Sequence, residues 1–189
     1  MSGKELSGLD WFKKNQSKYP NSTSVNDLEG GFKTKVKNFI KALEDAGASV
    51  DVESTLRDKT RAAIMHWAFK VANGKVKPKA VPDIKGVSIE WDHGDDKASV
   101  AAAKEMAGKS GFDIAFQPSL TSVHIEGKAI DMSISWSVKV LEIKDGKGKT
   151  VKIDKAPKSG QNKDLHKVGA SFGVKKLVKD RPHWSADGN

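Results

Sequence analysis

The chain has 189 residues, no cysteine and a formal net charge of +9. Disulfides and cysteine-ligated zinc are therefore excluded, so any zinc has to bind histidine and carboxylate side chains. No apolar run approaches the ~20 residues that span a bilayer, so we expect no stable membrane insertion.

The first 30 residues are polar with scattered aromatic side chains, and we expect residues 1–30 to form an irregular arm. Residues 31–189 are expected to form one domain. Apolar residues at helical spacing, with glycines at several ends, predict four helices in it. These helices span about 32–46, 58–73, 96–109 and 161–178.

Alternation of apolar and polar residues predicts the strands. They span about 48–54, 87–91, 129–136, 138–143 and 150–153. The last two flank a glycine-containing turn and are typical of a hairpin. Helices come first and strands mostly afterwards, which predicts an α+β fold: a single domain with helices packed on a central antiparallel sheet.

Two short segments carry residues that suit metal chemistry. Residues 122–131 include His124 and Asp131, and residues 180–185 include Asp180 and His183. A catalytic zinc needs three protein ligands, an open position and a general base beside it. The two segments offer these groups only if they meet in space.

The spacing within the first segment sets a condition on the chain. His124 and Asp131 are seven residues apart, so an unbroken strand would point them to opposite faces. Gly127 is a position where the chain can turn and bring them together. Taken singly, each candidate has a plainer interpretation. Asp131 is then an acid at the end of a strand, Asp180 is a surface acid, and His183 is a partly buried histidine.

The combined pattern Ser-x-His-x-x-Gly-x-Ala-x-Asp followed by Asp-x-x-His-Trp resembles the zinc D-Ala-D-Ala peptidase family. This family includes D,D-carboxypeptidases, D-Ala-D-Ala dipeptidases and the L-alanyl-D-glutamate endopeptidases of phage lysins. The resemblance covers roughly residues 54–69 and 118–188. It implies an α+β fold with zinc on a central antiparallel sheet, and it implies these roles: zinc ligands His124, Asp131 and His183, and catalytic base Asp180.

The chain departs from the family pattern at three positions. Asp180 stands where many members have glutamate, which favours the lysin branch, and Ser185 stands where many have histidine. Arg57 follows Leu56, where the family usually has tyrosine. The resemblance implies that Arg57 stabilises the oxyanion of the reaction; otherwise it is a surface arginine at the start of a helix.

Three further residues are candidate substrate contacts. Ser122 precedes His124 by two positions and can hydrogen-bond the substrate. Trp184 follows His183, and its ring can line the site and exclude water. His93 lies in a turn-like segment and either lines the cleft or is a plain turn residue.

The expected function is zinc-dependent hydrolysis of peptide bonds in peptidoglycan stem peptides by a monomer, as an L-alanyl-D-glutamate endopeptidase or a D,D-carboxypeptidase. The first residues lack the apolar core of a signal peptide. We therefore expect synthesis in the cytoplasm and action in the periplasm or cell wall after release or delivery, as an endolysin or a delivered lytic effector.

Two other functions stay open. One is a catalytically silent zinc-binding interaction domain. The other is a nucleic-acid binder, since the positive charge suits nucleic acid as well as an anionic cell wall. No zinc-finger, RNA-binding or phosphate-loop motif is found, so we expect no nucleic-acid partner.

Overall fold

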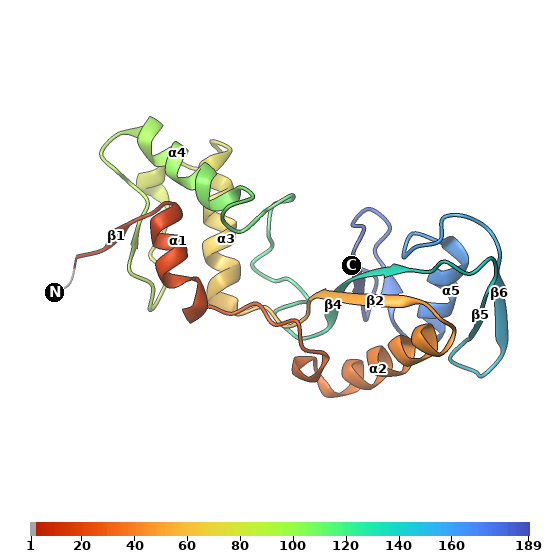
Figure 1. Cartoon of the computed structure of the whole chain (residues 1–189). Helices are drawn as coiled ribbons and strands as arrows, with labels where there is room; N and C mark the ends of the chain where they lie inside the picture. Colours follow the sequence, from red (N-terminus) through yellow and green to blue (C-terminus); the bar gives the residue numbers. More distant parts are fainter. Residues whose placement is uncertain (1–2) are drawn as a thin grey trace. The chain divides into compact units, whose positions relative to one another are not determined.

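The computed structural model describes residues 3–189, so residues 1–2 of the expected arm lie outside the described residues (Figure 1). The mixed helix-and-strand class is confirmed. The chain forms two compact units. Unit 1 contains the described residues up to Pro20 together with Asp58–Ser122, and unit 2 contains Asn21–Arg57 and Val123–Asn189. Neither unit begins at residue 31, where the sequence had suggested a boundary.

Unit 1 is mainly helical. Its helices are α1 (Leu9–Asn15), α3 (Lys59–Ala72) and α4 (Asp96–Ala107), with 3-10 turns at Gln16–Lys18 and Pro78–Ala80. A short parallel pair joins β1 (Glu5–Leu6) to β3 (Ile89–Glu90). The segment expected to be irregular therefore contains a helix, because Trp11 and Phe12 of α1 are buried in the core of this unit beside α3 and α4.

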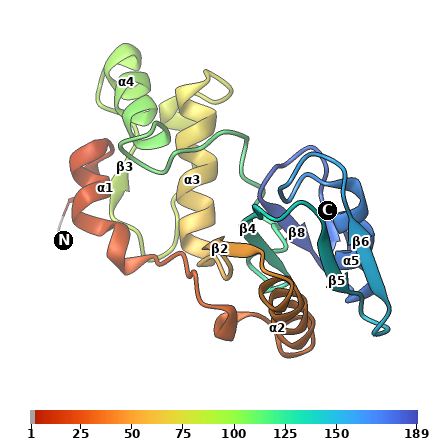
Figure 2. The same ribbon diagram turned by 45° about the vertical axis from the view of Figure 1, so that its right-hand side comes forward.

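Unit 2 contains a four-stranded antiparallel sheet, as the sequence predicted. Its strands lie in the order β2 (Ser49–Ser54), β4 (Ala129–Ser135), β8 (His183–Ser185) and β7 (Lys175–Lys176). The other elements of the unit are a 3-10 turn (Val25–Asp27), α2 (Gly30–Asp45), the hairpin β5 (Leu141–Lys144) and β6 (Thr150–Ile153), and α5 (Lys163–Ser171). Figure 2 shows α2 running alongside this sheet.

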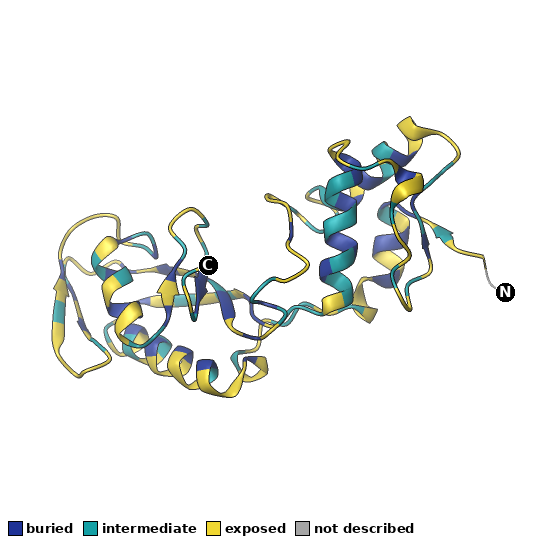
Figure 3. Cartoon of the chain, turned by 180° about the vertical axis from the view of Figure 1, so that it is seen from behind, coloured by how far each residue is buried: buried dark blue, intermediate teal, exposed yellow. Residues whose placement is uncertain are grey.

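The two faces of strand β4 differ, and this difference positions the site. Ile130, Met132 and Ile134 are buried in one core with the apolar side of α2. Asp131 and Ser133 alternate with them and therefore point to the opposite face. In Figure 3, α2 is buried in places and exposed along much of its length, as expected for a helix that covers one face of a sheet. The polar face of β4 carries Asp131 and Ser133.

Two predicted elements have different ends in the structure. The last predicted helix, 161–178, is too long, because Gly173 adopts a left-handed φ of +78° and ends the helical segment. Lys175 and Lys176 then form β7. The strand predicted from residue 138 begins at Leu141. Within residues 3–189, none of the helices combines the length and apolar character needed to cross a bilayer.

The turn before β4 depends on Gly127. Its φ is +67°, and an added Cβ would lie 2.8 Å from the backbone nitrogen of Glu29 at the start of α2. That same nitrogen donates a hydrogen bond to the Gly127 carbonyl oxygen at 2.9 Å. The predicted turn between His124 and Asp131 is therefore confirmed, and glycine is needed both for its backbone conformation and for this close approach.

We predict that Gly127→Ala lowers the free energy of unfolding by about 2 kcal/mol or more, through the left-handed conformation and the clash with Glu29. The matched control is Gly148→Ala, where φ is +80° but nothing lies within 4 Å of the added Cβ. Denaturant unfolding of both variants measures the difference. Equal losses in the two variants would show that the close approach to Glu29 does not matter.

Candidate metal centre

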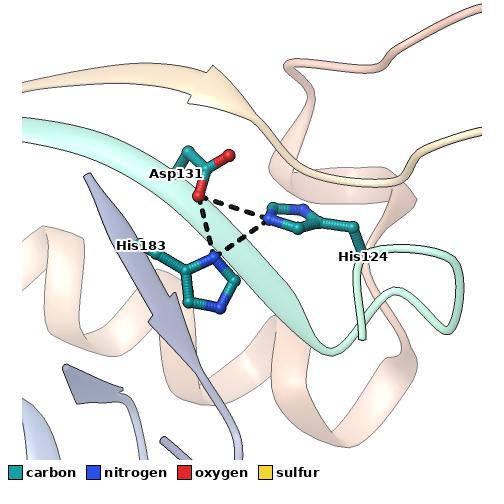
Figure 4. Close-up of side chains that lie close together, drawn as sticks. All are labelled: His124, Asp131 and His183. Atoms are coloured by element: carbon teal, nitrogen blue, oxygen red, sulfur yellow. Dashed lines mark hydrogen bonds and ion pairs between the residues drawn. The ribbon is translucent and has the colours of Figure 1, made fainter. Parts of the chain in front are cut away.

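Three side chains meet on the polar face of the unit 2 sheet. Asp131 on β4 and His183 on β8 are directly paired in the antiparallel register, so their side chains lie beside each other. His124 comes from the turn before β4, where its carbonyl oxygen accepts hydrogen bonds from the backbone nitrogens of Gly127 and Arg57 at 3.2 and 3.1 Å. The structure thus brings together the three residues that the sequence predicted as metal ligands (Figure 4).

The three inward atoms form a nearly equilateral triangle. His124 Nε2 lies 3.2 Å from Asp131 Oδ1 and 3.2 Å from His183 Nδ1, and His183 Nδ1 lies 3.0 Å from Asp131 Oδ1. In a tetrahedral site with bonds of 2.0–2.1 Å, neighbouring ligand atoms lie roughly 3.3 Å apart. The observed triangle is therefore close to one face of such a tetrahedron.

The outer ring nitrogens decide which atoms carry protons. His124 Nδ1 lies 2.7 Å from the carbonyl oxygen of Thr55, and His183 Nε2 lies 3.0 Å from the main-chain oxygen of Asn189. Both oxygens can only accept, so both outer nitrogens donate. The inner nitrogens of the neutral rings then hold lone pairs. This is the usual arrangement of metal-binding histidines, in which an outer acceptor fixes the ring and its tautomer.

Three lone pairs pointing at one another need a positive charge between them. A single proton on one ring can be donated along two edges of the triangle and leaves the third edge as a contact between two lone pairs. A metal ion at the centre accepts from all three atoms at once. We conclude that His124, Asp131 and His183 could hold a metal ion. Two imidazoles and a carboxylate suit zinc and also ferrous iron, so the donors alone do not choose the metal.

The charge of Asp131 fits this role. Burial opposes ionisation of its carboxyl group, but the contacts with His124 and His183 outweigh burial and hold the pKa of Asp131 well below its usual range. The carboxylate is therefore ionised at neutral pH, as a metal ligand must be.

Asp180 lies in a tight turn that leads to His183. Its backbone nitrogen donates to Leu177 at 3.1 Å, and its carbonyl oxygen accepts from the backbone nitrogen of His183 at 3.2 Å. Its side chain is half-buried. Its carboxylate acts electrostatically on both Arg57 and Lys176.

Arg57 lies on the same side of unit 2. Its backbone pairs with Asn21, its backbone nitrogen donates to His124, and its Nε contacts the Asn21 side-chain oxygen at 3.5 Å. Burial lowers the pKa of Arg57, while the carboxylates of Asp131 and Asp180 act in the opposite direction. The guanidinium therefore lies within electrostatic reach of both carboxylates, unlike an arginine on the open surface.

Sequence reasoning missed Lys176, which fixes the turn that carries Asp180 and His183. Its buried ammonium donates to the carbonyl oxygens of Leu177 at 2.7 Å, of His183 at 3.0 Å, and of Asp180. It also lies 5.6 Å from the centre of the Trp184 ring. One side chain thus ties together three carbonyls of one turn. The sequence gives little sign of this, because Lys176 follows another lysine in a basic chain.

The three candidate substrate contacts have different positions. Trp184 is 0% exposed and lies in the core against Phe39, so its assignment as a substrate contact is wrong in this structure: a fully buried ring has no surface to offer. His93 belongs to unit 1, where its Nε2 lies 3.0 Å from Ser7 Oγ. Ser122 also belongs to unit 1. The assignments of both residues as substrate contacts stay predictions.

No family model, curated protein or solved structure matches this chain.

We predict that the protein binds one equivalent of zinc and that Asp131→Ala weakens binding by more than about 100-fold, because a buried anionic ligand is lost. Competition with a chromophoric chelator measures the affinity. Glu142→Gln is the control, since this exposed residue pairs with Lys152 on the β5–β6 hairpin. Unchanged affinity in Asp131→Ala would remove Asp131 from the metal site.

We predict that Lys176→Met lowers the free energy of unfolding by about 2 kcal/mol, because three buried carbonyls lose a charged donor while the apolar stem is kept. Zinc affinity should fall as well, since the turn positions His183. Lys175→Met, at the exposed neighbouring position, is the control. A wild-type affinity and stability in Lys176→Met would show that the turn does not need this side chain.

The same residue predicts a dependence on pH. Burial lowers the pKa of Lys176 from 10.5 to about 8. Between about pH 8 and pH 10.5, Lys176 keeps its proton in the unfolded chain but has released it in the folded chain. This group therefore makes the free energy of unfolding rise with pH across that window. Unfolding measured at pH 8 and pH 10 should therefore show a smaller rise, or a steeper fall, in Lys176→Met than in the wild type. Identical pH profiles would contradict the depressed pKa.

Proposed function

We propose that this protein is a zinc-dependent peptidase that hydrolyses peptide bonds in peptidoglycan stem peptides. One observation carries the proposal: three lone pairs converge on one point, and the Arg57 guanidinium is in electrostatic reach of both the ligand Asp131 and the acid Asp180. The motif resemblance supplies the reaction class. The net charge of +9 suits an anionic cell wall.

The donors fit zinc, which takes two imidazoles and a carboxylate in a site with one open position. Bound there, zinc supplies a Lewis acid that polarises the substrate carbonyl and lowers the pKa of a water molecule to about 7. His124, Asp131 and His183 would hold it. The carbonyl oxygens of Thr55 and Asn189 keep the two rings oriented.

Asp180 is the proposed general base. It takes a proton from the attacking water as the water oxygen bonds to the carbonyl carbon. It then gives a proton to the amine nitrogen as the C–N bond breaks. The products are one carboxylate and one amine, and no co-reactant besides water is needed. Asp180 is joined to the ligand His183 by a short hydrogen-bonded turn, which supports this role.

Arg57 is the proposed partner of the developing oxyanion. Its guanidinium is largely withdrawn from water and stays charged, so it can offset negative charge on the carbonyl oxygen. The two cleavage types, L-alanyl-D-glutamate endopeptidase and D,D-carboxypeptidase, both use this set of groups. Action in the periplasm or cell wall, as an endolysin or a delivered effector, is part of the proposal.

We predict that purified peptidoglycan is cleaved by the zinc-loaded protein, that chelation abolishes cleavage and that zinc restores it. Asp180→Asn should keep zinc and lose about 100-fold or more in kcat, and Arg57→Ala should lose a similar factor. Mass spectrometry of the fragments identifies the bond. Asp154→Asn, an exposed acid on a loop after β6, is the control.

The outcomes separate the alternatives. Zinc bound at full stoichiometry with no cleavage would support a silent interaction domain. Cleavage that continues in excess chelator would contradict a metal mechanism. Normal turnover in Asp180→Asn would place the base elsewhere.

A further inference from the structure

A cavity of about 250 Å³ lies in unit 2 and shares β4 and the turn before β8 with the metal centre. It is lined by residues of β2 and β4, by the loop at 159–161 and by the turn between Asp180 and His183. Its polar lining consists of Glu53, Ser133, Ser159, Gln161 and Arg181. None of these residues is used by the proposed mechanism.

The cavity and the metal centre share the same elements. Glu53 precedes Ser54, which pairs with Asp131 in the register of the sheet. Ser133 lies two positions after Asp131 on the same face of β4. Arg181 and Pro182 lie between the proposed base and the last ligand in sequence. A substrate held at the metal centre therefore has only a short distance to reach the cavity.

The wall opposite β2 is fixed by hydrogen bonds. The backbone nitrogen of Gly160 donates to Ile134 at 3.0 Å, and the side-chain nitrogen of Gln161 donates to the Arg181 carbonyl oxygen at 2.7 Å. The backbone nitrogen of Met132 donates to Pro182 at 2.9 Å. These hydrogen bonds join the loop at 159–161 and the turn at Arg181 and Pro182 to each other and to β4.

Two charges of opposite sign line this space. The Glu53 carboxylate accepts a hydrogen bond from the Ser133 hydroxyl. Among the residues that the structure describes, neither Glu53 nor Arg181 makes an ion pair. An acid and a guanidinium that are both available in one cavity suit a ligand group that carries an ammonium and a carboxylate together.

We infer that this cavity is the subsite for the diamino-acid residue of the stem peptide, and that it selects a side chain ending in an amino-acid head group, as in diaminopimelate. Glu53 takes the ammonium and Arg181 takes the carboxylate. The inference rests on the proposed function, since it names the substrate of the same site. A lysine side chain, with an ammonium alone, leaves Arg181 without a partner.

The position along the substrate agrees with this assignment. Extended chains rise about 3.3 Å per residue, so Ser133 lies roughly 7 Å from Asp131 along β4, which is two residues of an extended peptide. In the stem, the diamino acid is the second residue on the C-terminal side of the L-alanyl-D-glutamate bond and the second on the N-terminal side of the D-Ala-D-Ala bond. The distance therefore suits either bond, but the peptide would run through the site in opposite directions in the two cases.

The test compares three synthetic stem peptides that differ only at this residue: free diaminopimelate, diaminopimelate amidated at its distal carboxyl, and lysine. The zinc-loaded wild type should show kcat/KM about fivefold or more higher on the first than on the other two. Arg181→Gln should remove this preference. Glu53→Gln should lower kcat/KM about fivefold on all three, since all carry the ammonium. Controls are Glu44→Gln and Lys139→Gln, both exposed and away from the cavity lining.

A binding measurement separates failure of the subsite from failure of the function. Each peptide is titrated calorimetrically into zinc-loaded Asp180→Asn, with and without Arg181→Gln. Equal kcat/KM on the three peptides, or a preference that survives Arg181→Gln, overturns the subsite and leaves the peptidase standing. If no peptide is cleaved, the proposed function fails; tighter binding of the free diaminopimelate peptide that Arg181→Gln abolishes still supports the subsite, and equal binding overturns it.

Discussion

The mutual approach of three lone pairs is the constraint on which the site depends. His124, Asp131 and His183 place their inner atoms 3.0–3.2 Å apart, and two carbonyl oxygens on the outside hold both rings in the tautomer that aims a lone pair inward. Such an arrangement is unfavourable unless a cation occupies its centre. The fold around it supplies the positions: a direct strand pairing for two ligands and a glycine turn for the third.

The two faces of the unit 2 sheet have different roles. One face of β4 is apolar and packs on α2, while the other carries the metal centre and the adjoining cavity. Lys176 stabilises the turn that leads into β8. A buried ammonium is costly, but three carbonyls of one turn accept its protons, and that turn carries the proposed base and one ligand.

Much of this could be predicted from the sequence where the signal is long and periodic. The spacing of Phe32, Val36 and Phe39 predicts α2 closely, and alternation predicts β4. Short elements escape such reasoning: β7 and β8 have two and three residues, too few to show a period. The overlong last helix has the same cause, because the apolar residues that flank β7, Val174, Leu177 and Val178, continue the helical spacing beyond Gly173. Convergence of the ligands was expected from the resemblance of two motifs to the peptidase family and from a turn at Gly127. The burial of Trp184, the contacts of Lys176 and the cavity beside β4 arise from tertiary packing and leave no local pattern.

X-ray absorption at the zinc edge of the zinc-loaded protein tests the central claim most directly. The geometry predicts two imidazole nitrogens and one carboxylate oxygen at about 2.0–2.1 Å, and a water oxygen as the fourth ligand. The outer atoms of the two imidazole rings should add the scattering that marks histidine. A spectrum without imidazole scattering, or with one imidazole only, would show that the three side chains do not bind a common ion.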